Sequence, residues 1–373
     1  MIDDHVVWWP FEDAQAFAEA AFSAAGVPGP DARICSEVLL EADKRGIDSH
    51  GIGRLKPIYI DRIREGTLQT ITKTDIVRES PATAVVDGNN GMGFVVAKAS
   101  MELAIEKAAK YGIGMVATRR SNHYGIAGYY PLMAIQKGMI GITGTNARPS
   151  IAPTFGVENM LGTNPLTWGM PTDEAFPFVL DCATSIAQRG KIEVYDRAGK
   201  EIPEGWVIGS DGGIRTDTHQ ILQDLVSGEA ALLPLGGAGE AQAGYKGYGY
   251  ATVVEILSAA LQNGNFLKLL SGFDESGNKQ PFGVGHFFIA INVESFIDLS
   301  TFKRITGTIL RQLRASKKAA GAERIYTAGE KEHLAWLERK DKGVPMNAVL
   351  QKQMSWLKET YGLSDFSFPW EKD

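Results

Sequence analysis

The chain has 373 residues, which is enough for about two or three domains with sizeable hydrophobic cores. Its hydrophobic content of 44% and charged content of 22% are typical of globular proteins. The formal net charge of −6 argues against a nucleic-acid surface, because binding phosphates needs clustered cations.

The sequence predicts neither a membrane anchor nor a metal site. No apolar segment reaches the ~20 residues that span a bilayer, and "MIDDHVVWWPFEDAQAF" lacks the basic start of a signal peptide. Cys35 and Cys182 lie far apart without a CxxC or Cys/His cluster, so we expect free thiols and no structural zinc. Free thiols fit a reducing compartment, and we therefore expect a cytoplasmic protein without membrane or nucleic-acid partners.

Helix signals dominate residues 10–65. "PFEDAQAFAEAAFSAAG" begins with proline and acidic residues and ends at Gly26, and "PDARICSEVLLEADKRG" ends in the same way at Gly46. "RLKPIYIDRIREG" continues the pattern. We predict an α-helical domain over residues 1–75, joined by C-terminal helices from about 310–373.

Short β-type runs separated by glycine and proline turns begin near residue 76. Helices are predicted between them at 93–110, 126–137 and 247–262. This pattern predicts an α/β domain over residues 76–309. The runs are "TAVVDG", "GIGMVATRR", "MIGITGTN", "PLTWGM", "FVLDCAT" and "HFFIAINVESF".

The turn "GNNGMG", at residues 88–93, lies between a strand and a helix, as a dinucleotide-binding loop does. Its glycine order is GxxGxG, whereas the Rossmann fingerprint is GxGxxG followed by an acidic residue after the second strand. Arg119 and Arg120 occupy that second position, which leaves only an NADP variant of the fingerprint. Regular strand–helix alternation also stops after residue 140, so a Rossmann fold is disfavoured.

The stretch "DSHGIGRL" brings Ser49, His50 and Arg54 together. If a helix resumes after Gly51, Arg54 lies about one turn beyond His50, and both side chains face one pocket. Arginine offers a forked donor that matches a carboxylate, and histidine titrates near neutral pH. A capping serine beside an exposed histidine and arginine is the alternative.

His123, in "RRSNHYG", follows the apolar strand "IGMVAT". Proteins of the α/β class bind ligands beyond the carboxyl ends of strands, and a neutral imidazole is a common general base for alcohol oxidation. A purely structural histidine is the alternative.

Two further stretches combine polar residues with turns. In "TGTNARPS", Asn146 supplies both a donor and an acceptor, and a role in a turn is the alternative to a functional one. Arg148, beside Pro149, is less easily explained by a turn, and a surface arginine is the alternative. In "AGYKGYGYATVVEIL", Lys246 lies where a helix begins, and free N–H groups there suit a pyrophosphate. The spacing is not that of a P-loop.

These stretches occur together and in the same order in one family. "ADKRGIDSHGIGRL", "VVDGNNGMG", "RRSNHYG", "LGTNPL", "LDCATS", "GYKGYGYATVVEIL" and "RIYTAGEKE" resemble the malate/L-lactate dehydrogenase-like oxidoreductases over about residues 10–335. That family includes malate, L-sulfolactate and ureidoglycolate dehydrogenases, diketogulonate reductase and piperideine-2-carboxylate reductases. Each motif is short, but seven of them in register make the resemblance specific.

The resemblance implies an α/β fold in which a mixed-sheet NAD(P)-binding domain packs against an α-helical domain, unrelated to the Rossmann fold, in a homodimer. It implies hydride transfer between NAD(P) and a 2-hydroxy or 2-keto acid, and "GNNGMG" becomes a tight turn into a core helix. Carried over residue by residue, the catalytic positions are His123, as proton acceptor, and His50, as proton donor. Ser49, Arg54 and Arg148 become candidates for substrate binding. The nucleotide positions are Asn146, Asp181, Cys182, Ala183, Tyr245, Lys246, Gly247, Gly329 and Glu330.

Malate and oxaloacetate are the predicted substrate pair; lactate, sulfolactate, ureidoglycolate and cyclic imine carboxylates remain alternatives. Ala328 replaces a proline of several relatives, and "LPLGGAGEAQAGYKG" is longer than the equivalent loop in some members. We predict NAD, with NADP left open by Arg119 and Arg120. A hydrolase is disfavoured because neither Ser49 nor Ser121 lies in GxSxG, and an inactive dimeric scaffold is the non-enzymatic alternative. The predicted chemistry needs no metal, because histidine and arginine polarise a carbonyl.

Overall fold

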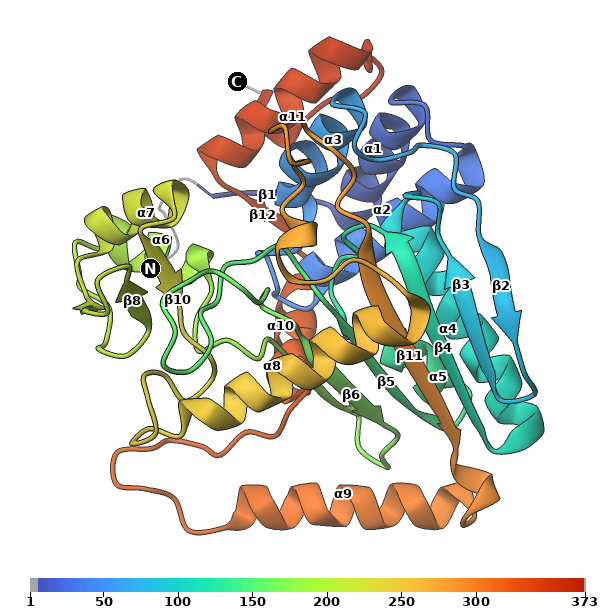
Figure 1. Cartoon of the computed structure of the whole chain (residues 1–373). Helices are drawn as coiled ribbons and strands as arrows, with labels where there is room; N and C mark the ends of the chain where they lie inside the picture. The colour runs from blue at the N-terminus through green and yellow to red at the C-terminus, as the bar shows by residue number, and fades with distance from the viewer. Residues whose placement is uncertain (1–5, 372–373) are drawn as a thin grey trace.

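A mixed seven-stranded sheet forms the centre of the protein, which a computed structural model describes over residues 6–371 (Figure 1). The strand order is β2-β3-β4-β11-β5-β6-β7, in which β3 and β4 run parallel and the other neighbours antiparallel. A doubly wound fold needs successive parallel strands, so this order confirms the prediction of a mixed-sheet α/β fold that is not a Rossmann fold. The strands are β2 (Asp75–Glu79), β3 (Thr83–Asp87), β4 (Ile113–Ser121), β5 (Met139–Thr145), β6 (Leu166–Met170), β7 (Phe178–Cys182) and β11 (Val284–Asn292).

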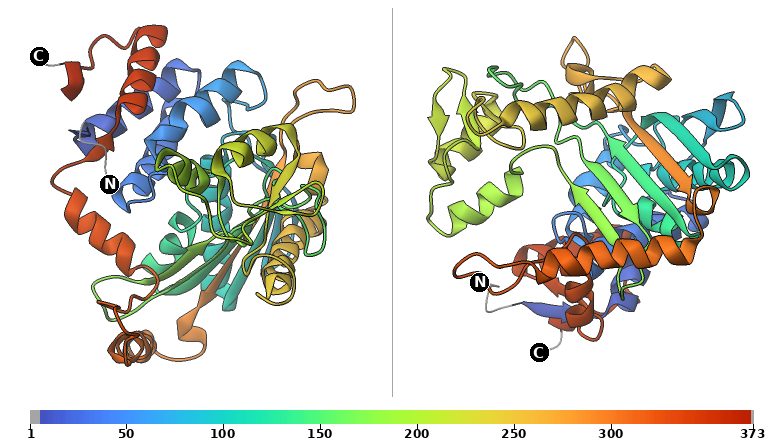
Figure 2. Two further views of the ribbon diagram at one scale, coloured as in Figure 1. Left: turned by 90° about the vertical axis from the view of Figure 1, so that its left-hand side faces the viewer. Right: turned by 90° about the horizontal axis from the view of Figure 1, so that it is seen from below.

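Helices cover both faces of this sheet (Figures 1 and 2). Phe287 and Phe288 are adjacent on β11, and successive strand side chains point to opposite faces. Phe287 joins a cluster with Val254 of α8, whereas Phe288 joins the cluster beneath α4 and α5. Burial on both faces explains why this strand is a continuous apolar run. The helices are α4 (Gly93–Tyr111), α5 (Tyr129–Gln136) and α8 (Gly244–Ala259).

The two ends of the chain share one helical core. Strand β1 pairs antiparallel with β12, and Trp9 packs edge-on against Phe368 with ring centroids 5.1 Å apart. A cluster of buried side chains joins the N-terminal helices to the C-terminal helix, and Figure 1 shows them at the same end of the molecule. The elements are β1 (Val7–Trp9), α1 (Phe11–Ala24), α2 (Gly29–Lys44), α3 (Asp61–Arg64), β12 (Val344–Met346) and α11 (Ala348–Tyr361).

A small lobe and two further helices complete the fold. The lobe has its own three-stranded sheet, in the order β10-β8-β9, and its own buried cluster. Helix α9 lies along the edge of the molecule opposite the helical core (Figure 2). The lobe contains α6 (Arg189–Arg197), β8 (Val207–Gly209), β9 (Ile214–Arg215), α7 (Thr218–Ser227) and β10 (Ala230–Leu232); the helices are α9 (Leu299–Ala315) and α10 (Glu330–Arg339).

The turn at residues 88–93 leads from β3 into α4 and packs against the chain around His123. A Cβ on Gly93 would overlap the backbone oxygens of Asn122 and His123, so only glycine permits this approach. Asn122 Nδ2 donates to two backbone oxygens of the turn, at 2.9 and 3.0 Å. The turn therefore fixes the backbone of the predicted catalytic histidine.

Arg119 and Arg120 both pair with Asp87, at 2.9 and 2.7 Å. Because Asp87 at the end of β3 already pairs with both guanidinium groups, the structure gives no support to an NADP site built on Arg119 and Arg120. None of the described helices is long and apolar enough to cross a membrane. The prediction that no signal peptide is present includes residues 1–5, which lie outside the described residues.

Candidate active site

The loop that follows α2 presents His50. Asp43, buried near the end of α2, accepts a hydrogen bond from the Ile52 N–H at 2.7 Å, and burial raises the pKa of this carboxyl well above its ordinary value. A Cβ on Gly51 would overlap the Asp43 carboxylate, so the loop requires glycine there. The Ser49 hydroxyl lies 2.9 Å from His50 Nδ1.

Two arginines tie this loop in place. Arg54 Nε donates to the carbonyl oxygen of Ser49. Arg339, from α10, donates to the carbonyl oxygen of Asp43 at 2.9 Å and forms a two-point ion pair with Asp48. The position of His50 thus depends on contacts with the C-terminal part of the chain.

His123 lies just beyond the end of β4, beside His50. The two rings are nearly parallel, with an interplanar angle of 18° and centroids 5.7 Å apart. The Tyr59 hydroxyl is 2.6 Å from His123 Nδ1, and the Gly125 N–H donates to the same nitrogen at 3.3 Å. The structure therefore brings together the two histidines that the sequence singles out separately.

Both histidines are neutral at physiological pH. Burial, followed by the charge of Arg54, lowers the pKa of His50 to about 4. Burial also lowers the pKa of His123 well below its ordinary value, and the charges of Arg62 and Arg54 add to the effect. Neutral imidazole rings can stack without repulsion and can each donate or accept a proton.

Three arginines give this site a positive potential. The charges of Arg54 and Arg62 act on His123; burial, and after it the charge of Arg148, lowers the pKa of Arg62. The Arg62 guanidinium lies over the ring of Phe282, 4.1 Å from its centroid. Within residues 6–371, none of these three arginines has an acidic partner at ion-pair distance. The acidic residues near them in sequence pair elsewhere: Asp48 with Arg339, Asp61 with Lys56, and Glu65 with Lys279.

A cavity of about 660 Å³ opens beside His50, a volume typical of small-molecule sites. Ser49 and His50 line one side, and the segment from Asp181 to Ala183, at the end of β7, lines another. Asp181 accepts hydrogen bonds from the Gly128 N–H at 2.6 Å and from Thr167 at 3.1 Å, while burial raises its pKa. Ser49 and His50 thus share one cavity with the predicted cofactor residues Asp181, Cys182 and Ala183, whereas His123, Arg54 and Arg148 are not among the residues that line it.

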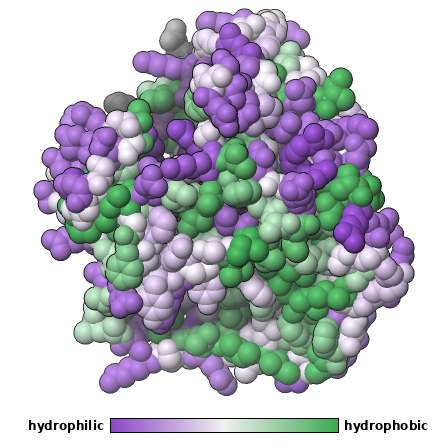
Figure 3. Space-filling view, viewed as in Figure 1, coloured by the Kyte–Doolittle hydropathy of each residue, from purple (hydrophilic) through white to green (hydrophobic). Residues whose placement is uncertain are grey.

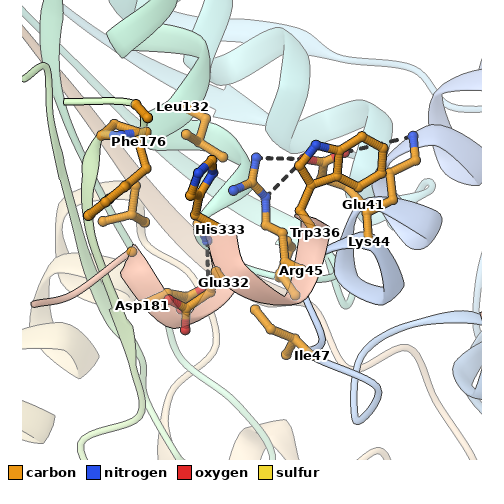
Figure 4. A pocket seen from close by; sticks show the side chains of 16 residues that line it. Glu41, Lys44, Arg45, Ile47, Leu132, Phe176, Asp181, Glu332, His333 and Trp336 are labelled. Carbon is orange, nitrogen blue, oxygen red and sulfur yellow. Dashed lines mark hydrogen bonds and ion pairs between the residues drawn. The ribbon is translucent and has the colours of Figure 1, made fainter. Parts of the chain in front are cut away.

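Figure 4 shows the residues that line a second cavity, of about 420 Å³. Asp181, Glu332, Ile47 and Ile126 line both cavities. Gly329, a predicted cofactor residue, lies in the second cavity at the start of α10, with a φ of +90° that favours glycine. Because the two cavities share lining residues, we refer to them together as the hollow between the helical core and the sheet.

The remaining predicted cofactor residues are not among those that line the hollow. Tyr245 and Lys246 are exposed at the start of α8, and Gly247 packs against Leu235, which lines the larger cavity. Asn146 is buried, and its amide already bridges the carbonyl oxygen of Asn265 and the N–H of Gly285, at 2.9 and 2.8 Å.

Glu330 is also buried. It pairs with Arg324 and accepts a hydrogen bond from the Thr327 N–H at 3.2 Å. Like Asn146, it holds neighbouring loops together in this structure, so the cofactor role of both residues stays a prediction.

The hollow has groups that fit a dinucleotide. Gln188, Gly190 and Lys191, from the first turn of α6, line the larger cavity, and helix N-termini bind phosphate groups. Ser185 lines the same cavity; it is only 5% exposed, and its hydroxyl has no partner within the described residues. These donors suit the diphosphate of a nicotinamide dinucleotide. Within the described residues, no cluster of His, Cys, Asp and Glu could hold a metal ion.

Tyr59, Arg62 and Ser185 are site residues that the sequence analysis missed. Tyr59 lies in a π-helical turn, Leu55–Ile60, that leads directly into α3. Such a turn changes the direction of the following side chains, and π-turns occur often at functional sites. The only sequence signal is that Arg62 follows Arg54 in the same helical stretch.

Comparisons with known proteins agree on one family. The family model described as malate/L-lactate dehydrogenase matches residues 9–355. The chain is 42% identical to malate dehydrogenase of Pyrococcus horikoshii, over 97% of this chain and 98% of the relative. It is 41% identical to L-sulfolactate dehydrogenase of Methanocaldococcus jannaschii, over 91% and 93% of the two chains. The crystal structure of malate dehydrogenase from Entamoeba histolytica superposes with a TM-score of 0.93 at 44% identity, covering 98% of this chain and 100% of that one.

Proposed function

The chain belongs to the malate/L-lactate dehydrogenase family, and we propose that it interconverts a 2-keto and a 2-hydroxy dicarboxylic acid, with oxaloacetate and malate as the pair. As a member of this family, it is an oxidoreductase that acts on CH–OH donors with a nicotinamide cofactor. One observation carries the choice of a dicarboxylic acid. The neutral pair His50 and His123 lies beside arginines that have no acidic partner in the described part of the chain. Arg54 and Arg62 are partly buried, whereas Arg148 is exposed. Partly buried cations without a partner, such as Arg54 and Arg62, indicate an anionic ligand.

The arginines divide the substrate between them in this proposal. Arg54, beside His50, holds the carboxylate next to the reacting carbon, and Arg62 with Arg148 holds the second carboxylate. A guanidinium binds a carboxylate through two parallel hydrogen bonds, which also fixes the orientation of the substrate. A monocarboxylic acid such as lactate leaves Arg62 and Arg148 without a partner, so the proposal ranks it below malate.

The histidines act at the oxygen atom on C2. The nicotinamide cofactor supplies or accepts the hydride when it is bound. His123 binds that oxygen and exchanges its proton, and His50 orients the carboxylate end or serves as the second proton carrier. The lowered pKa values keep both rings neutral, so that each has a donor and an acceptor nitrogen at physiological pH.

We favour NAD over NADP. Asp181 and Glu332 line both parts of the hollow, and carboxylates accept hydrogen bonds from ribose hydroxyls but repel a 2′-phosphate. Dissociation constants for NADH and NADPH, measured by fluorescence, test this choice. Tighter binding of NADPH would contradict it.

A homodimer completes the proposal. On α9, Ile305, Ile309 and Leu313 recur every four residues and are 45%, 53% and 54% exposed, which is the pattern of a covered helix face. Figure 3 shows apolar side chains gathered between α8 and α9. Light scattering after size-exclusion chromatography should give twice the mass of the chain; a monomer would refute this part.

The free thiols Cys35 and Cys182 support a reducing compartment, and we propose the cytoplasm.

The decisive experiment is an assay of the purified protein with NADH or NADPH. The panel contains oxaloacetate, pyruvate, sulfopyruvate, the keto acid of ureidoglycolate and a cyclic imine carboxylate, and nicotinamide absorbance is followed. Fastest oxidation of NADH with oxaloacetate is expected. Faster turnover of another acid would replace the substrate, cofactor binding without turnover would indicate an inactive scaffold, and no cofactor binding would overturn the proposal.

A further inference from the structure

The Nδ1 atom of His123 faces two hydrogen-bonding groups at once. One is the Tyr59 hydroxyl, at 2.6 Å, and the other is the backbone N–H of Gly125, at 3.3 Å. A hydroxyl can donate or accept, but a backbone N–H can only donate. The direction of the Gly125 contact therefore indicates which nitrogen of the neutral ring carries the proton.

A lone pair on Nδ1 satisfies both neighbours. The Gly125 N–H then donates to Nδ1, and the Tyr59 hydroxyl donates to the same atom. The opposite tautomer, with the proton on Nδ1, would place two N–H groups against each other and would turn Tyr59 into an acceptor. Tyr59 is fully buried between Phe22 and Phe94, and no other acceptor for its hydroxyl proton occurs within the described residues. That tautomer would leave a buried donor unsatisfied.

The backbone around His123 holds this arrangement in place. Gly125 has a φ of +78°, and a Cβ at that position would lie 2.7 Å from the ring of Phe94, so another residue could not keep the N–H in the same place. Gly93 packs directly against the carbonyl oxygen of His123. The two donors and the ring are therefore set by rigid, buried contacts.

We propose that Tyr59, together with the Gly125 N–H, is a positioning residue that holds neutral His123 as the Nε2–H tautomer. His123 then presents a proton, and not a lone pair, on the side away from Tyr59. The burial that keeps this ring uncharged supports the assignment, because a protonated ring would carry hydrogen on both nitrogens.

The consequence for the reaction rests on the proposed function. A keto oxygen only accepts hydrogen bonds, so it matches an Nε2–H donor without any rearrangement. A 2-hydroxy acid can give its hydroxyl proton to His123 only after the ring has changed tautomer. The resting enzyme is thus arranged to bind the keto acid, and the tautomer change is a requirement of the oxidation. In the reduction, Nδ1 must gain a proton as Nε2 gives its own to the substrate oxygen, because the ring would otherwise be left as an imidazolate.

Nitrogen NMR of protein labelled with ¹⁵N-histidine tests the tautomer directly and does not depend on activity. The His123 signals are assigned by their loss in His123→Gln. At pH 7.5 we expect Nδ1 without a proton and Nε2 with one in the wild type, and a mixture of tautomers in Tyr59→Phe. Tyr129→Phe is the matched control, because it removes a phenol that donates to Glu37 at 2.7 Å and does not touch His123. A proton on Nδ1 in the wild type would overturn the proposal, as would an unchanged tautomer in Tyr59→Phe.

Initial rates in both directions give the second readout. Loss of one neutral hydrogen bond should raise the KM for oxaloacetate by roughly 2- to 12-fold in Tyr59→Phe, with a smaller change in the KM for malate. Tyr129→Phe should leave both values unchanged. Equal changes for the two substrates would show that Tyr59 only supports the fold. If the wild type turns over no 2-keto acid, the proposed function fails, while the NMR result still decides the tautomer.

Discussion

Replacing Arg62 by methionine is the sharpest test of the dicarboxylate proposal. Methionine keeps an unbranched apolar stem of similar reach against Phe282, so the change removes the charge and the forked donor while most of the packing remains. The charge of Arg62 acts on His123, and no acidic partner compensates for it in the described part of the chain. The loss should therefore affect the substrate more than the fold.

The magnitude follows from the kind of contact that is removed. A hydrogen bond to a charged group contributes about 1.5–3 kcal/mol, because the partner would otherwise be left partly desolvated and unpaired. Taking about 2 kcal/mol, kcat/KM for oxaloacetate should fall roughly 30-fold, mainly through KM. Pyruvate has no second carboxylate, so its kcat/KM should change by less than about 3-fold.

Steady-state kinetics with both keto acids is the assay, and Arg64→Met is the matched control. Arg64 lies on the same helix, α3, and also covers an aromatic ring, with its guanidinium 5.1 Å from the centroid of Trp356. We expect the control to behave as the wild type with both substrates. Equal losses for oxaloacetate and pyruvate in Arg62→Met would refute the reasoning, because Arg62 would then support the site as a whole.

Three further outcomes are expected. His123→Ala should reduce turnover by about 10²–10⁴-fold while NADH still binds, as judged by steady-state rates and fluorescence titration; near-normal turnover would remove His123 from the mechanism. Gly51→Ala should lower the free energy of unfolding by about 1–3 kcal/mol, measured by urea denaturation, because its Cβ overlaps the buried Asp43 carboxylate; an unchanged midpoint would mean that the loop relaxes at no cost. Burial lowers the pKa of His286 to about 3, so the unfolded chain binds the extra proton as pH falls through 6.5. The contribution of neutral His286 to the free energy of unfolding is therefore present above pH 6.5 and is lost on acidification. Between pH 7 and 5 the free energy of unfolding of the wild type should fall by about 2 kcal/mol more than that of His286→Gln. Equal losses in the two proteins would contradict a buried, neutral His286.

The central elements were predictable because their sequence signals are local. The helix expected at 93–110 is α4, Gly93–Tyr111, and the run "MIGITGTN" is β5, Met139–Thr145. In both cases glycines bound an apolar segment of the right period. The place of β11 between β4 and β5 was not predictable, because it is fixed by pairing between segments far apart in the chain.

The lobe around α6 and α7 escaped prediction for another reason. Helix α6, Arg189–Arg197, is short and mostly polar, and the neighbouring strands have two or three residues each. Segments of this length carry almost no periodic signal, and packing decides their structure.

The candidate site likewise contains residues that the sequence predicts and residues that it does not. His50 and His123 stand out in the sequence as single residues, and the resemblance to the family assigns both of them to one reaction. Tyr59 and Arg62 do not stand out, because the π-turn at Leu55–Ile60 changes the direction of their side chains relative to an α-helix. The proposed site for a second carboxylate follows only from the three-dimensional arrangement, which places Arg62 near His123 while acidic residues close to Arg62 in sequence pair elsewhere.

The contacts of Arg339 with the loop before His50 bear on how the enzyme matures during synthesis. Asp43 and Asp48 leave the ribosome early, but Arg339 follows almost 300 residues later, as does the strand Val344–Met346 that pairs with β1. Domains begin to fold while the chain is still being made, at about 5–20 residues per second. The central sheet can therefore assemble while the polypeptide is tethered, but the loop with His50 gains its last anchor only near the end of translation. A nascent chain should stay inactive until its C-terminal residues emerge.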